Sequence, residues 1–470
     1  MANAMMKAYR ACPRSLQTIG INLVETTSWA LDRSPTTGRY LEQLKAVQSW
    51  SREELDRYQS TKLRQVVRYA YDNVPFYRRL YDQERVDVES VRTVKDLDKL
   101  PMITKEDVRI NYDDLQSRKS VRSKVQYTSG TTISPLKVRI STDAIKLNRA
   151  SSLLRDHWAG YRGERAARFV GDQAITDCAD TTLYRRSFVM NRFLYSSKCI
   201  SVQTSRRILD SLKNNKVQIL QCYPSAGYIL AKFLERYDEH LPLKAVLYSS
   251  EPLHGFEREL IEDRFQCRAF GFYGQIEHAV TAAECEKGSY HLAMLDGVLE
   301  IVNNGEQVGE GERGSTVVTA LANQAMPLIR YQLNDLTGYT GEDCSCGRRT
   351  PTIHPVESKA DDLIITPSGR IVTPLAITSL LKSARNVLEG QIVQGSIDSL
   401  TVRIVPLEDF SAEDEELLQQ MFTSALGEEI TIRVEKVGTI HASGAGKKRR
   451  VISQISGDPF DRAFSEVEEK

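Results

Sequence analysis

Small polar residues gather in one stretch of the sequence, Tyr127-Thr128-Ser129-Gly130-Thr131-Thr132. Such residues form poor core and poor helix, but a loop built from them offers backbone N–H and side-chain O–H groups to an anion at short range. Gly130 lets the backbone turn sharply. Taken alone, the stretch is more typical of a polar surface turn than of a phosphate site. Polyphosphate binding is therefore a hypothesis that other residues must support.

A second group of residues has the composition of a metal site. Cys285 and His291 are separated by five residues, and Cys344-Ser345-Cys346-Gly347 follows later in the chain. Three thiolates and one imidazole suit tetrahedral zinc, and four protein ligands leave no open position, so the metal would be structural. The alternative is that these are ordinary buried thiols. The other cysteines have no such arrangement and are interpreted as packing residues: Cys12, Cys178, Cys199, Cys222 and Cys267.

The middle of the chain has the pattern of a parallel sheet. Short apolar runs at 167–170, 218–223, 245–248 and 269–272 alternate with helical patterns. Such alternation indicates parallel strands covered by helices, with ligands held at the carboxyl ends of the strands. Two of these ends carry polar residues, in the sequences Ser249-Ser250-Glu251-Pro252 and Tyr273-Gly274-Gln275-Ile276-Glu277.

The remaining elements divide the chain into two predicted domains, 1–357 and 358–470. An amphipathic helix over 51–72 begins at a capping box formed by Ser51 and Glu54. Residues 296–340 alternate strands with glycine turns, which predicts a β-rich segment of the large domain. Beyond Asp361-Asp362 a compact α+β order follows: helices at 374–383 and 411–426, with strands near 391–394, 400–405 and 430–435. The predicted fold class is α/β.

Composition excludes several classes of protein. The 470 residues include 63 basic and 62 acidic side chains, so no global field favours nucleic acid. No apolar run is long enough to span a bilayer, and residues 1–30 lack the apolar centre of a secretory signal. We expect a cytoplasmic protein without a membrane span.

The motifs together resemble a known family. In order they are 127–135, Ser250-Glu251-Pro252, Tyr273-Gly274-x-x-Glu277, Arg330-Tyr331 with Asp335, Asp361-Asp362, and Gly446-Lys447. This ordered set resembles the adenylate-forming enzymes, and most of all the phenylacetate–CoA ligase family, particularly its branch found in polysaccharide loci. The resemblance covers about residues 50–455. It implies a large N-terminal domain and a small C-terminal domain that swings between two half-reactions, with Asp361 near the hinge.

The resemblance also implies a reaction and a set of roles. A carboxylate attacks the α-phosphorus of ATP to give an acyl-adenylate and pyrophosphate, and the thiol of CoA then displaces AMP. By this resemblance Thr128, Ser129, Gly130, Thr131 and Thr132 hold phosphates, and Glu277 binds Mg²⁺, a hard cation that prefers oxygen ligands. Tyr273 and Gly274 lie against adenine, Ser250 and Glu251 line the base and acyl pocket, and Asp335 accepts the ribose hydroxyls.

Lys447 is implied as the catalytic lysine, with the adjacent Lys448 as an alternative. A mobile cation at the α-phosphate stabilises a transition state that is crowded with negative charge. Lys359 stands where the family has an arginine, so it keeps the charge and loses the bidentate fork. His278 either contacts substrate or caps a helix. Tyr77 follows an amphipathic helix, a placement more typical of core than of an acyl pocket.

Three questions stay open at the sequence level. The family loop continues with glycine and a basic residue where this chain has Ile133-Ser134, and Lys137 is the nearest replacement for the charge. The acceptor is either CoA or an amine, because the polysaccharide-locus branch need not use CoA. A nucleotide-binding homologue without catalysis is the third alternative, and a homodimer is the assembly that we consider.

Overall fold

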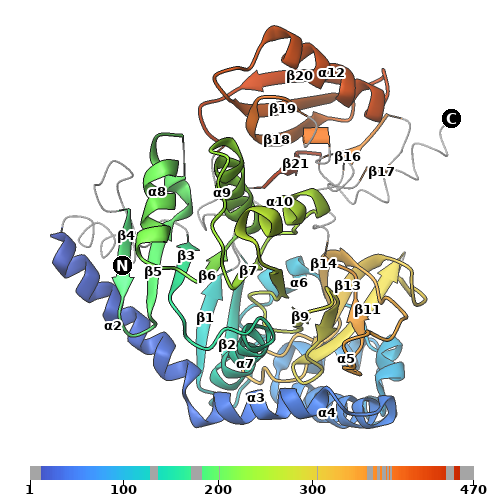
Figure 1. Ribbon diagram of the computed structural model, residues 1–470. Helices are drawn as coiled ribbons and strands as arrows, with labels where there is room; N and C mark the ends of the chain where they lie inside the picture. Colours follow the sequence, from blue (N-terminus) through green and yellow to red (C-terminus); the bar gives the residue numbers. More distant parts are fainter. Residues whose placement is uncertain are drawn as a thin grey trace.

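In the computed structural model the described residues are 12–127, 136–170, 183–200, 202–303, 305–356, 364–367, 371–372, 377, 380–381, 384–440 and 449–455. They form a large α/β body, with a small α+β domain above it in Figure 1. Within these residues no helix is long and apolar enough to cross a membrane.

Helices dominate the N-terminal part of the body. The helices α2 (Arg14–Asp32), α3 (Pro35–Val47), α4 (Arg52–Asn73) and α5 (Pro75–Gln83) follow one another along its left and lower sides (Figure 1). The predicted capping box starts α4: the N–H of Ser51 donates to the Glu54 carboxylate at 2.7 Å, and the N–H of Glu54 donates to the Ser51 hydroxyl at 3.2 Å. After two 3₁₀ turns, η1 (Val88–Ser90) and η2 (Val94–Lys99), a short helix α6 (Lys105–Ile110) begins at a second capping box.

The predicted parallel sheet is confirmed. Among the described residues the large sheet has nine strands, in the order β15-β10-β9-β8-β7-β6-β3-β5-β4. Parallel pairing joins β3 (Ala166–Val170), β5 (Arg192–Ser196), β6 (Ile219–Cys222), β7 (Ala245–Ser249) and β8 (Ala269–Tyr273). Antiparallel strands extend it at both edges: β4 (Tyr184–Ser187), β9 (Ala282–Glu284), β10 (Tyr290–Leu292) and β15 (Thr352–Ile353).

Helices pack against this sheet as the alternating pattern predicts. They are α7 (Thr142–Trp158), α8 (Val202–Asn214), α9 (Pro224–Arg236) and α10 (Gly255–Phe265), with a 3₁₀ turn η3 (Ser197–Cys199) after β5. Pro224 opens α9 at its first position, where the missing N–H is not needed. One glycine of β8 is required by packing, because a Cβ on Gly271 would lie 1.8 Å from the Tyr290 hydroxyl oxygen.

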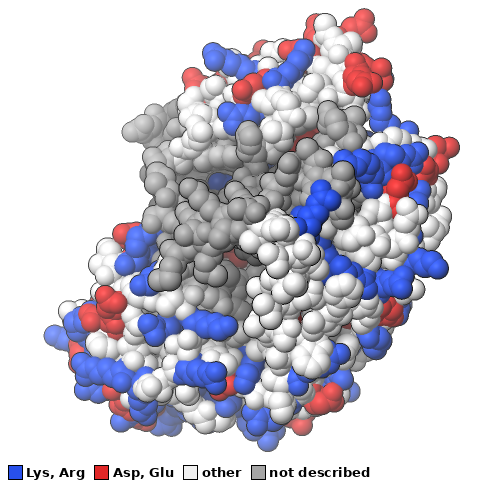
Figure 2. All heavy atoms as spheres, turned by 90° about the vertical axis from the view of Figure 1, so that its left-hand side faces the viewer, with Lys and Arg blue, Asp and Glu red and all other residues white. Residues whose placement is uncertain are grey.

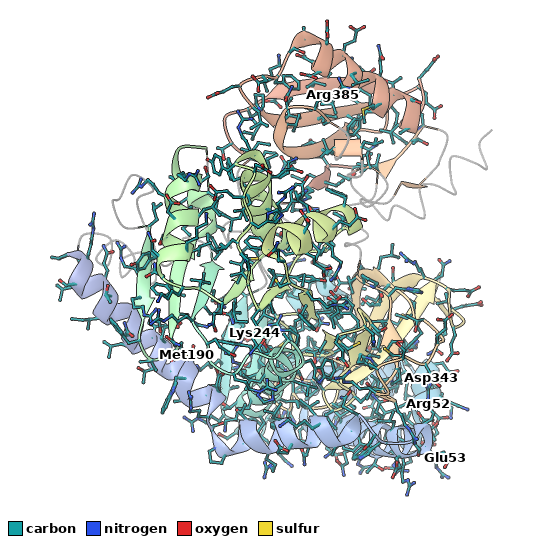
Figure 3. All side chains as sticks on the ribbon, viewed as in Figure 1. Arg52, Glu53, Met190, Lys244, Asp343 and Arg385 are labelled. Carbon is teal, nitrogen blue, oxygen red and sulfur yellow. The ribbon has the colours of Figure 1, made fainter. Side chains whose placement is uncertain are left out.

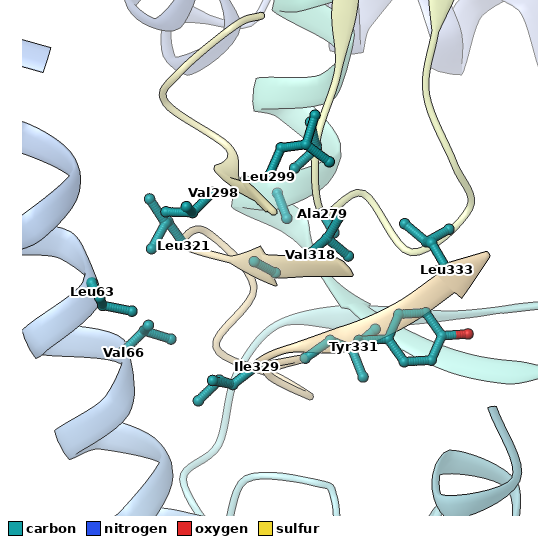
Figure 4. Close-up of a cluster of buried hydrophobic side chains, with 14 of the residues drawn as sticks. Leu63, Val66, Ala279, Val298, Leu299, Val318, Leu321, Ile329, Tyr331 and Leu333 are labelled. Atoms are coloured by element: carbon teal, nitrogen blue, oxygen red, sulfur yellow. The ribbon is translucent and has the colours of Figure 1, made fainter. Parts of the chain in front are cut away.

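The β-rich segment forms a second sheet in the order β12-β11-β13-β14. Its strands are β11 (Gly297–Asn303), β12 (Glu306–Gln307), β13 (Gly314–Ala320) and β14 (Tyr331–Thr337), and a separate hairpin pairs β1 (Ser123–Tyr127) with β2 (Lys137–Ser141). Figure 4 shows Leu63 and Val66 of α4 beside Val298, Val318 and Ile329 from this sheet region. Each such buried aliphatic side chain contributes about 1.5–3 kcal/mol, so this contact fixes α4 against the sheet.

The small domain has a sheet and a core of its own. The strands β18 (Val387–Ser396), β19 (Ser399–Pro406), β20 (Thr431–Lys436) and β21 (Val451–Ser453) pair in the order β20-β19-β18-β21, and α12 (Ala412–Leu426) packs on them. A short pair, β16 (Ile364–Ile365) and β17 (Ile371–Val372), precedes them. Figure 3 shows Arg385 in this upper domain and Lys244 in the body below. The predicted boundary after residue 357 stays a prediction, because 357–363 lie outside the described residues.

Candidate functional site

The carboxyl ends of two parallel strands bring the first site residues together. Ser249 at the end of β7 lies opposite Phe272 of β8, so the residues that follow each strand leave the same edge of the sheet. Ser250 and Glu251 continue from β7, and Tyr273 is the last residue of β8. This edge is where an open α/β sheet binds ligands.

Two tyrosine–carboxylate pairs join motifs that are far apart in the sequence. The hydroxyl of Tyr273 donates to Oδ2 of Asp335 at 2.8 Å, across 62 positions. The hydroxyl of Tyr331 donates to Oε1 of Glu277 at 3.3 Å, across 54 positions. Burial, with the neighbouring carboxylates, raises the pKa of both tyrosine hydroxyls well above its usual value, so both remain donors at neutral pH. The fold therefore assembles Tyr273, Glu277 and Asp335 in one place.

Left-handed backbone conformations lie at these motifs. Ser250, His278, Arg330 and Asn334 have φ values of 75°, 49°, 47° and 60°. A non-glycine residue in a sparsely populated region of this kind costs about 1–3 kcal/mol and persists only where the surrounding structure fixes it. Described residues elsewhere in the chain, such as Arg85 and Asn386, share this conformation, so it does not by itself locate the site.

Two buried polar atoms beside Glu277 have no hydrogen-bond partner in the part of the chain that the structure describes. They are Nε2 of Gln275 and Nδ1 of His278. The other ring nitrogen of His278 lies 3.3 Å from Oε1 of Gln126, next to the loop that follows β1. Burial lowers the pKa of His278 to about 4, so the ring is neutral at pH 7. A buried polar group without a partner costs about 1–3 kcal/mol, which a bound substrate would relieve.

Gln275 and Gln126 are site residues that the sequence did not indicate. Neither side chain belongs to a recognisable catalytic pair or metal-ligand spacing. For Gln275 the available signal was its position between Tyr273 and Glu277. Gln126 lies on β1 one position before Tyr127, and its contact with His278 spans 152 positions, which no local pattern reveals.

Glu251 has a structural contact in addition to its predicted place in the pocket. Its Oε2 accepts the backbone N–H of Ser225 at 3.1 Å. Ser225 is the second residue of α9, where backbone N–H groups lack helical partners and a carboxylate is favoured by the helix dipole. Glu251 therefore ties the end of β7 to the start of α9.

Arg450 of the small domain reaches into the large body. Its Nη2 lies 2.5 Å from Oε1 of Glu257 in α10, and its guanidinium carbon lies 5.4 Å from the ring centroid of Tyr228 in α9. The Glu257 side chain is completely buried. Arg450 is also held on its own domain, because its carbonyl accepts the N–H of Ile392 in β18 at 2.7 Å. This ion pair joins the two domains three positions after Lys447.

Several predicted residues lie outside the described residues. They are the loop residues Thr128, Ser129, Gly130, Thr131 and Thr132, together with Lys359 and Lys447. The strands that flank the loop are described, and Tyr127 pairs with Lys137 across them. The ammonium of Lys137 lies 4.0 Å from the ring centroid of Tyr112, so the proposed replacement for the family's basic residue lies over an aromatic ring in this structure.

Tyr77 lies in the core and does not line a pocket. It is 1% exposed, its hydroxyl donates to the Pro327 carbonyl at 3.1 Å, and the same oxygen accepts the N–H of Ile329 at 2.9 Å. With both functions of the hydroxyl used, nothing of this side chain is left for a substrate. Tyr77 is therefore a core residue, as its placement favours, and the weaker alternative of a substrate-pocket residue is wrong.

The structure brings the proposed metal ligands together. The ligand atoms of Cys285, His291, Cys344 and Cys346 all lie within 4.8 Å of one another. The sulfurs of Cys285 and Cys344 are 3.7 Å apart, and the sulfur of Cys346 is 3.3 Å from Nε2 of His291. Tetrahedral zinc with the usual bond lengths would separate two sulfurs by about 3.8 Å. The donor set and its spacing therefore fit zinc.

The surroundings of the cluster favour a metal-binding histidine. The Nδ1–H of His291 donates to the Thr350 carbonyl at 3.1 Å, which leaves Nε2 facing the cysteines. Burial lowers the pKa of His291 to about 4, so the ring is neutral, as a ligand must be. Gly347, at φ 83°, closes the turn after Cys346. The segment also contacts the N-terminal helices, because the N–H of Arg349 donates to the Gln48 carbonyl at 2.8 Å.

One cysteine differs from the sequence interpretation. Cys199 is disulfide-bonded, so its assignment as a packing thiol is wrong. Cys222 and Cys267 are free thiols, and burial raises the pKa of Cys222 well above its usual value and that of Cys267 to about 12, which suits packing residues. Cys178 lies outside the described residues.

Known proteins resemble this chain over most of its length. A phenylacetate–coenzyme A ligase of Thermus thermophilus is 27% identical over 388 residues, which cover 77% of this chain and 84% of that protein. Protein CapK of Staphylococcus aureus is 22% identical and covers 89% of this chain and 93% of its own. The family model of the CapK C-terminal domain matches residues 364–454. A crystal structure of 2-hydroxyisobutyryl-CoA ligase in the postadenylation state, in complex with R3-HIB-AMP, superposes with a TM-score of 0.67 at 21% identity, covering 90% of this chain and 94% of that one.

The fold, with its large α/β body and small α+β domain, is that of this 2-hydroxyisobutyryl-CoA ligase. The motif residues meet at the carboxyl ends of β7 and β8, the edge at which open α/β sheets bind ligands. In sequence the chain is similar to phenylacetate–coenzyme A ligases and to protein CapK, and its residues 364–454 match the CapK C-terminal domain.

Proposed function

We propose that this protein activates a carboxylic acid with ATP as an acyl-adenylate, releases pyrophosphate, and then transfers the acyl group to the thiol of CoA. The observation that carries the proposal is the assembly of Tyr273, Glu277 and Asp335 at the carboxyl ends of β7 and β8. The phenylacetate–CoA ligases among the relatives support the reaction. An enzymatic role is favoured over nucleotide binding without catalysis.

The pairs at the sheet edge suit the roles that we propose for them. Asp335, fixed by Tyr273, would accept the ribose hydroxyls, and the Tyr273 ring with Gly274 would lie against adenine. Glu277, oriented by Tyr331, would hold Mg²⁺, which offsets phosphate charge when bound. Positioning and charge stabilisation account for most of the catalysis in phosphoryl-group chemistry, so the main task of these residues is geometric.

The unpaired atoms of Gln275 and His278 point to the acid-binding part of the pocket. The contact of His278 with Gln126 on β1 supports a pocket near the start of the loop 128–132. We propose that loop as the cradle of the departing pyrophosphate. A carboxylate substrate would accept from the Gln275 amide, and Ser250 would border the same pocket. Lys447 would approach from the small domain and stabilise negative charge on the α-phosphate and the carboxylate.

We propose Zn²⁺ at Cys285, His291, Cys344 and Cys346 as a structural ion. Four protein ligands leave no coordination position for substrate. The site joins the segment after Glu277 to the segment after Asp335, so it would hold two walls of the active site in place.

The experiment that tests the function is carboxylate-dependent exchange of labelled pyrophosphate into ATP, with a panel of aryl, acyl and hydroxy acids. At least one acid should support exchange in the presence of Mg²⁺. Asp335→Asn should reduce that exchange, whereas Asp210→Asn on the exposed side of α8 serves as the matched control. Measurable ATP binding with no exchange for any acid would refute the proposal.

An amine is the second candidate acceptor. Protein CapK aligns with 89% of this chain whereas the ligase of Thermus thermophilus aligns with 77%, and the small domain matches the CapK family model. Mass spectrometry of the products, with CoA or an amine panel added to the same activated acid, distinguishes a thioester from an amide. Because ATP and CoA are cytoplasmic metabolites, we place the reaction in the cytoplasm. The homodimer stays a prediction.

A further inference from the structure

Helix α2 presents its polar side to the protein and its apolar side to solvent. Its buried residues are Gln17, Ile21 and Glu25. Its exposed residues include Leu16, Ile19, Leu23 and Val24, which are 51%, 56%, 67% and 66% exposed. An ordinary surface helix places its apolar stripe on the core instead. The orientation of α2 therefore requires a separate explanation.

Directed polar contacts fix this orientation. The Glu25 carboxylate accepts two hydrogen bonds from the guanidinium of Arg192, at 2.6 and 2.7 Å. The Gln17 carbonyl oxygen accepts from Arg185 at 2.9 and 2.6 Å. The Asn22 amide donates to a backbone carbonyl in β4 at 2.9 Å and accepts a backbone N–H just after that strand at 2.8 Å. Because these bonds are directional, α2 cannot rotate to bury its apolar side without breaking them.

The exposed side is a continuous apolar surface. Leu16, Ile19 and Leu23 have the i, i+3, i+7 spacing of one helix face, and Val24 borders them. The ring of Phe188, which is 71% exposed, follows β4 beside Asn22. We call Leu16, Ile19, Leu23, Val24 and Phe188 the outer face of α2. Contiguous exposed apolar surface of this kind marks an interaction site rather than ordinary surface variation.

The charges around the outer face of α2 are positive. Arg33 is exposed at the end of the helix and lies 4.8 Å from the Trp29 ring, and Arg186 lies 5.9 Å from the Phe188 ring. The acidic residues of α2, Glu25 and Asp32, face inward in ion pairs and are 9% and 10% exposed at the side chain. Figure 2 views this side of the molecule, where Lys and Arg side chains, with some Asp and Glu, lie among uncharged surface.

The positive charge near the outer face of α2 distinguishes between two possible partners, a second copy of the chain and an anionic membrane. Symmetric pairing of two copies would set the same patch against itself, so Arg33 and Arg186 of both copies would approach one another without an acidic residue of α2 between them. An anionic lipid surface accepts both features, because acyl chains cover the apolar side chains and headgroups attract the arginines. We propose that the outer face of α2 is a docking surface for anionic membranes.

Vesicle sedimentation tests the proposal with the whole chain. Wild-type protein should sediment with vesicles of equal phosphatidylglycerol and phosphatidylcholine, should stay in solution with phosphatidylcholine alone, and should be released as salt rises. Leu23→Glu should lower the bound fraction by about tenfold, because it places a charge in the apolar contact. Ile110→Glu is the matched control, since Ile110 is 72% exposed on α6, away from α2.

Both variants replace exposed side chains, and unchanged circular dichroism establishes that they fold. Two kinds of outcome would overturn the proposal. Wild-type protein that fails to sediment, or that binds neutral and anionic vesicles equally, contradicts an anionic membrane site. A wild-type dimer in size-exclusion chromatography that Leu23→Glu converts to a monomer would assign the face to a second copy instead.

Discussion

At the scale of the residue, Asp335 joins the fold to the proposed chemistry. Its carboxylate accepts from Tyr273, and its backbone N–H donates to the Thr316 hydroxyl at 3.2 Å. The first contact orients the group that would bind ribose, and the second holds it to the neighbouring strand β13. A change at Asp335 should therefore affect activity more than stability.

Asp335→Asn should reduce pyrophosphate exchange by about 10- to 100-fold, since a charge-assisted hydrogen bond contributes about 1.5–3 kcal/mol. Tyr273→Phe keeps the ring and removes only the orienting hydroxyl, so its loss should be smaller. Exchange rates at saturating and limiting ATP measure both effects. Equal losses in the two variants would show that Asp335 acts only through Tyr273.

Asp296 should make stability depend on pH. Burial raises its pKa to about 7, its Oδ2 accepts from the Thr281 hydroxyl at 2.5 Å, and its Oδ1 has no partner among the described residues. The unfolded chain has the ordinary pKa of about 3.9. The folded state therefore binds this proton more tightly, and the stabilisation is complete below about pH 4 and is lost as the pH rises to about 7.

Asp296→Asn should remove this dependence. Urea unfolding at pH 5 and pH 8 should show a wild-type decrease in the free energy of unfolding that is about 1–3 kcal/mol larger than in the variant. The surface variant Asp210→Asn should behave as the wild type. An identical decrease in the wild type and Asp296→Asn would contradict a raised pKa at this position.

The sequence predicted the motif residues better than their neighbours. Tyr273, Glu277 and Asp335 were indicated because each stands in a motif of fixed spacing. Gln275, Gln126 and Arg450 were not, because each acts through a contact between distant segments that leaves no local pattern. Tyr77 shows the converse limit, since an aromatic residue beside an amphipathic helix has the same signal in a core as in a pocket.

At the scale of the element, the cysteine–histidine cluster determines how firmly two active-site segments are held. Chelation of zinc, or Cys346→Ser, should lower the melting temperature by several degrees, because the ion binds the folded arrangement and not the unfolded chain. Elemental analysis and thermal denaturation measure the two quantities together. Cys267→Ser, at a free thiol outside the cluster, is the control. Less than about half an equivalent of zinc in freshly purified protein would contradict the site.

Helices and strands could be predicted from the sequence where the spacing of apolar residues matches the period of the element and those residues face the core. The parallel strands β3, β6, β7 and β8 are short apolar runs between helical patterns, and α4 has a capping box and a single apolar face. In α2 most of the large apolar residues lie outside and two of the three buried residues are polar, so periodicity alone assigns the wrong face to the core. Its orientation follows from the partners Arg185 and Arg192, which are more than 160 positions away.

At the scale of the whole molecule, Arg450 links the small domain to the body near the proposed catalytic lysine. The ion pair with the buried Glu257 joins the two domains in their present relative orientation. If the small domain turns between half-reactions, this pair must break and form again. The present orientation brings the segment after Lys447 against α10. The ion pair should therefore favour the half-reaction that uses this orientation of the small domain.

Arg450→Ala should slow adenylation by about tenfold or more, because it removes the contact between the domains and leaves the buried Glu257 without its cationic partner. Transfer from a supplied acyl-adenylate to CoA should change less. Comparing the rates of the two half-reactions separates an effect on domain orientation from a general loss of activity. The double variant Arg450→Met/Glu257→Gln should recover stability without recovering adenylation. Equal slowing of both half-reactions would contradict a role in domain orientation.

In the proposed reaction a substrate carboxylate attacks the α-phosphorus of ATP. Once pyrophosphate exchange has identified an acid, that acid can be supplied with both carboxylate oxygens labelled with ¹⁸O and converted in a single turnover with the acceptor. We expect AMP that carries one ¹⁸O atom, because the oxygen joining the acyl group to phosphorus leaves with AMP. Unlabelled AMP, or ¹⁸O recovered in inorganic phosphate with ADP as the product, would contradict it.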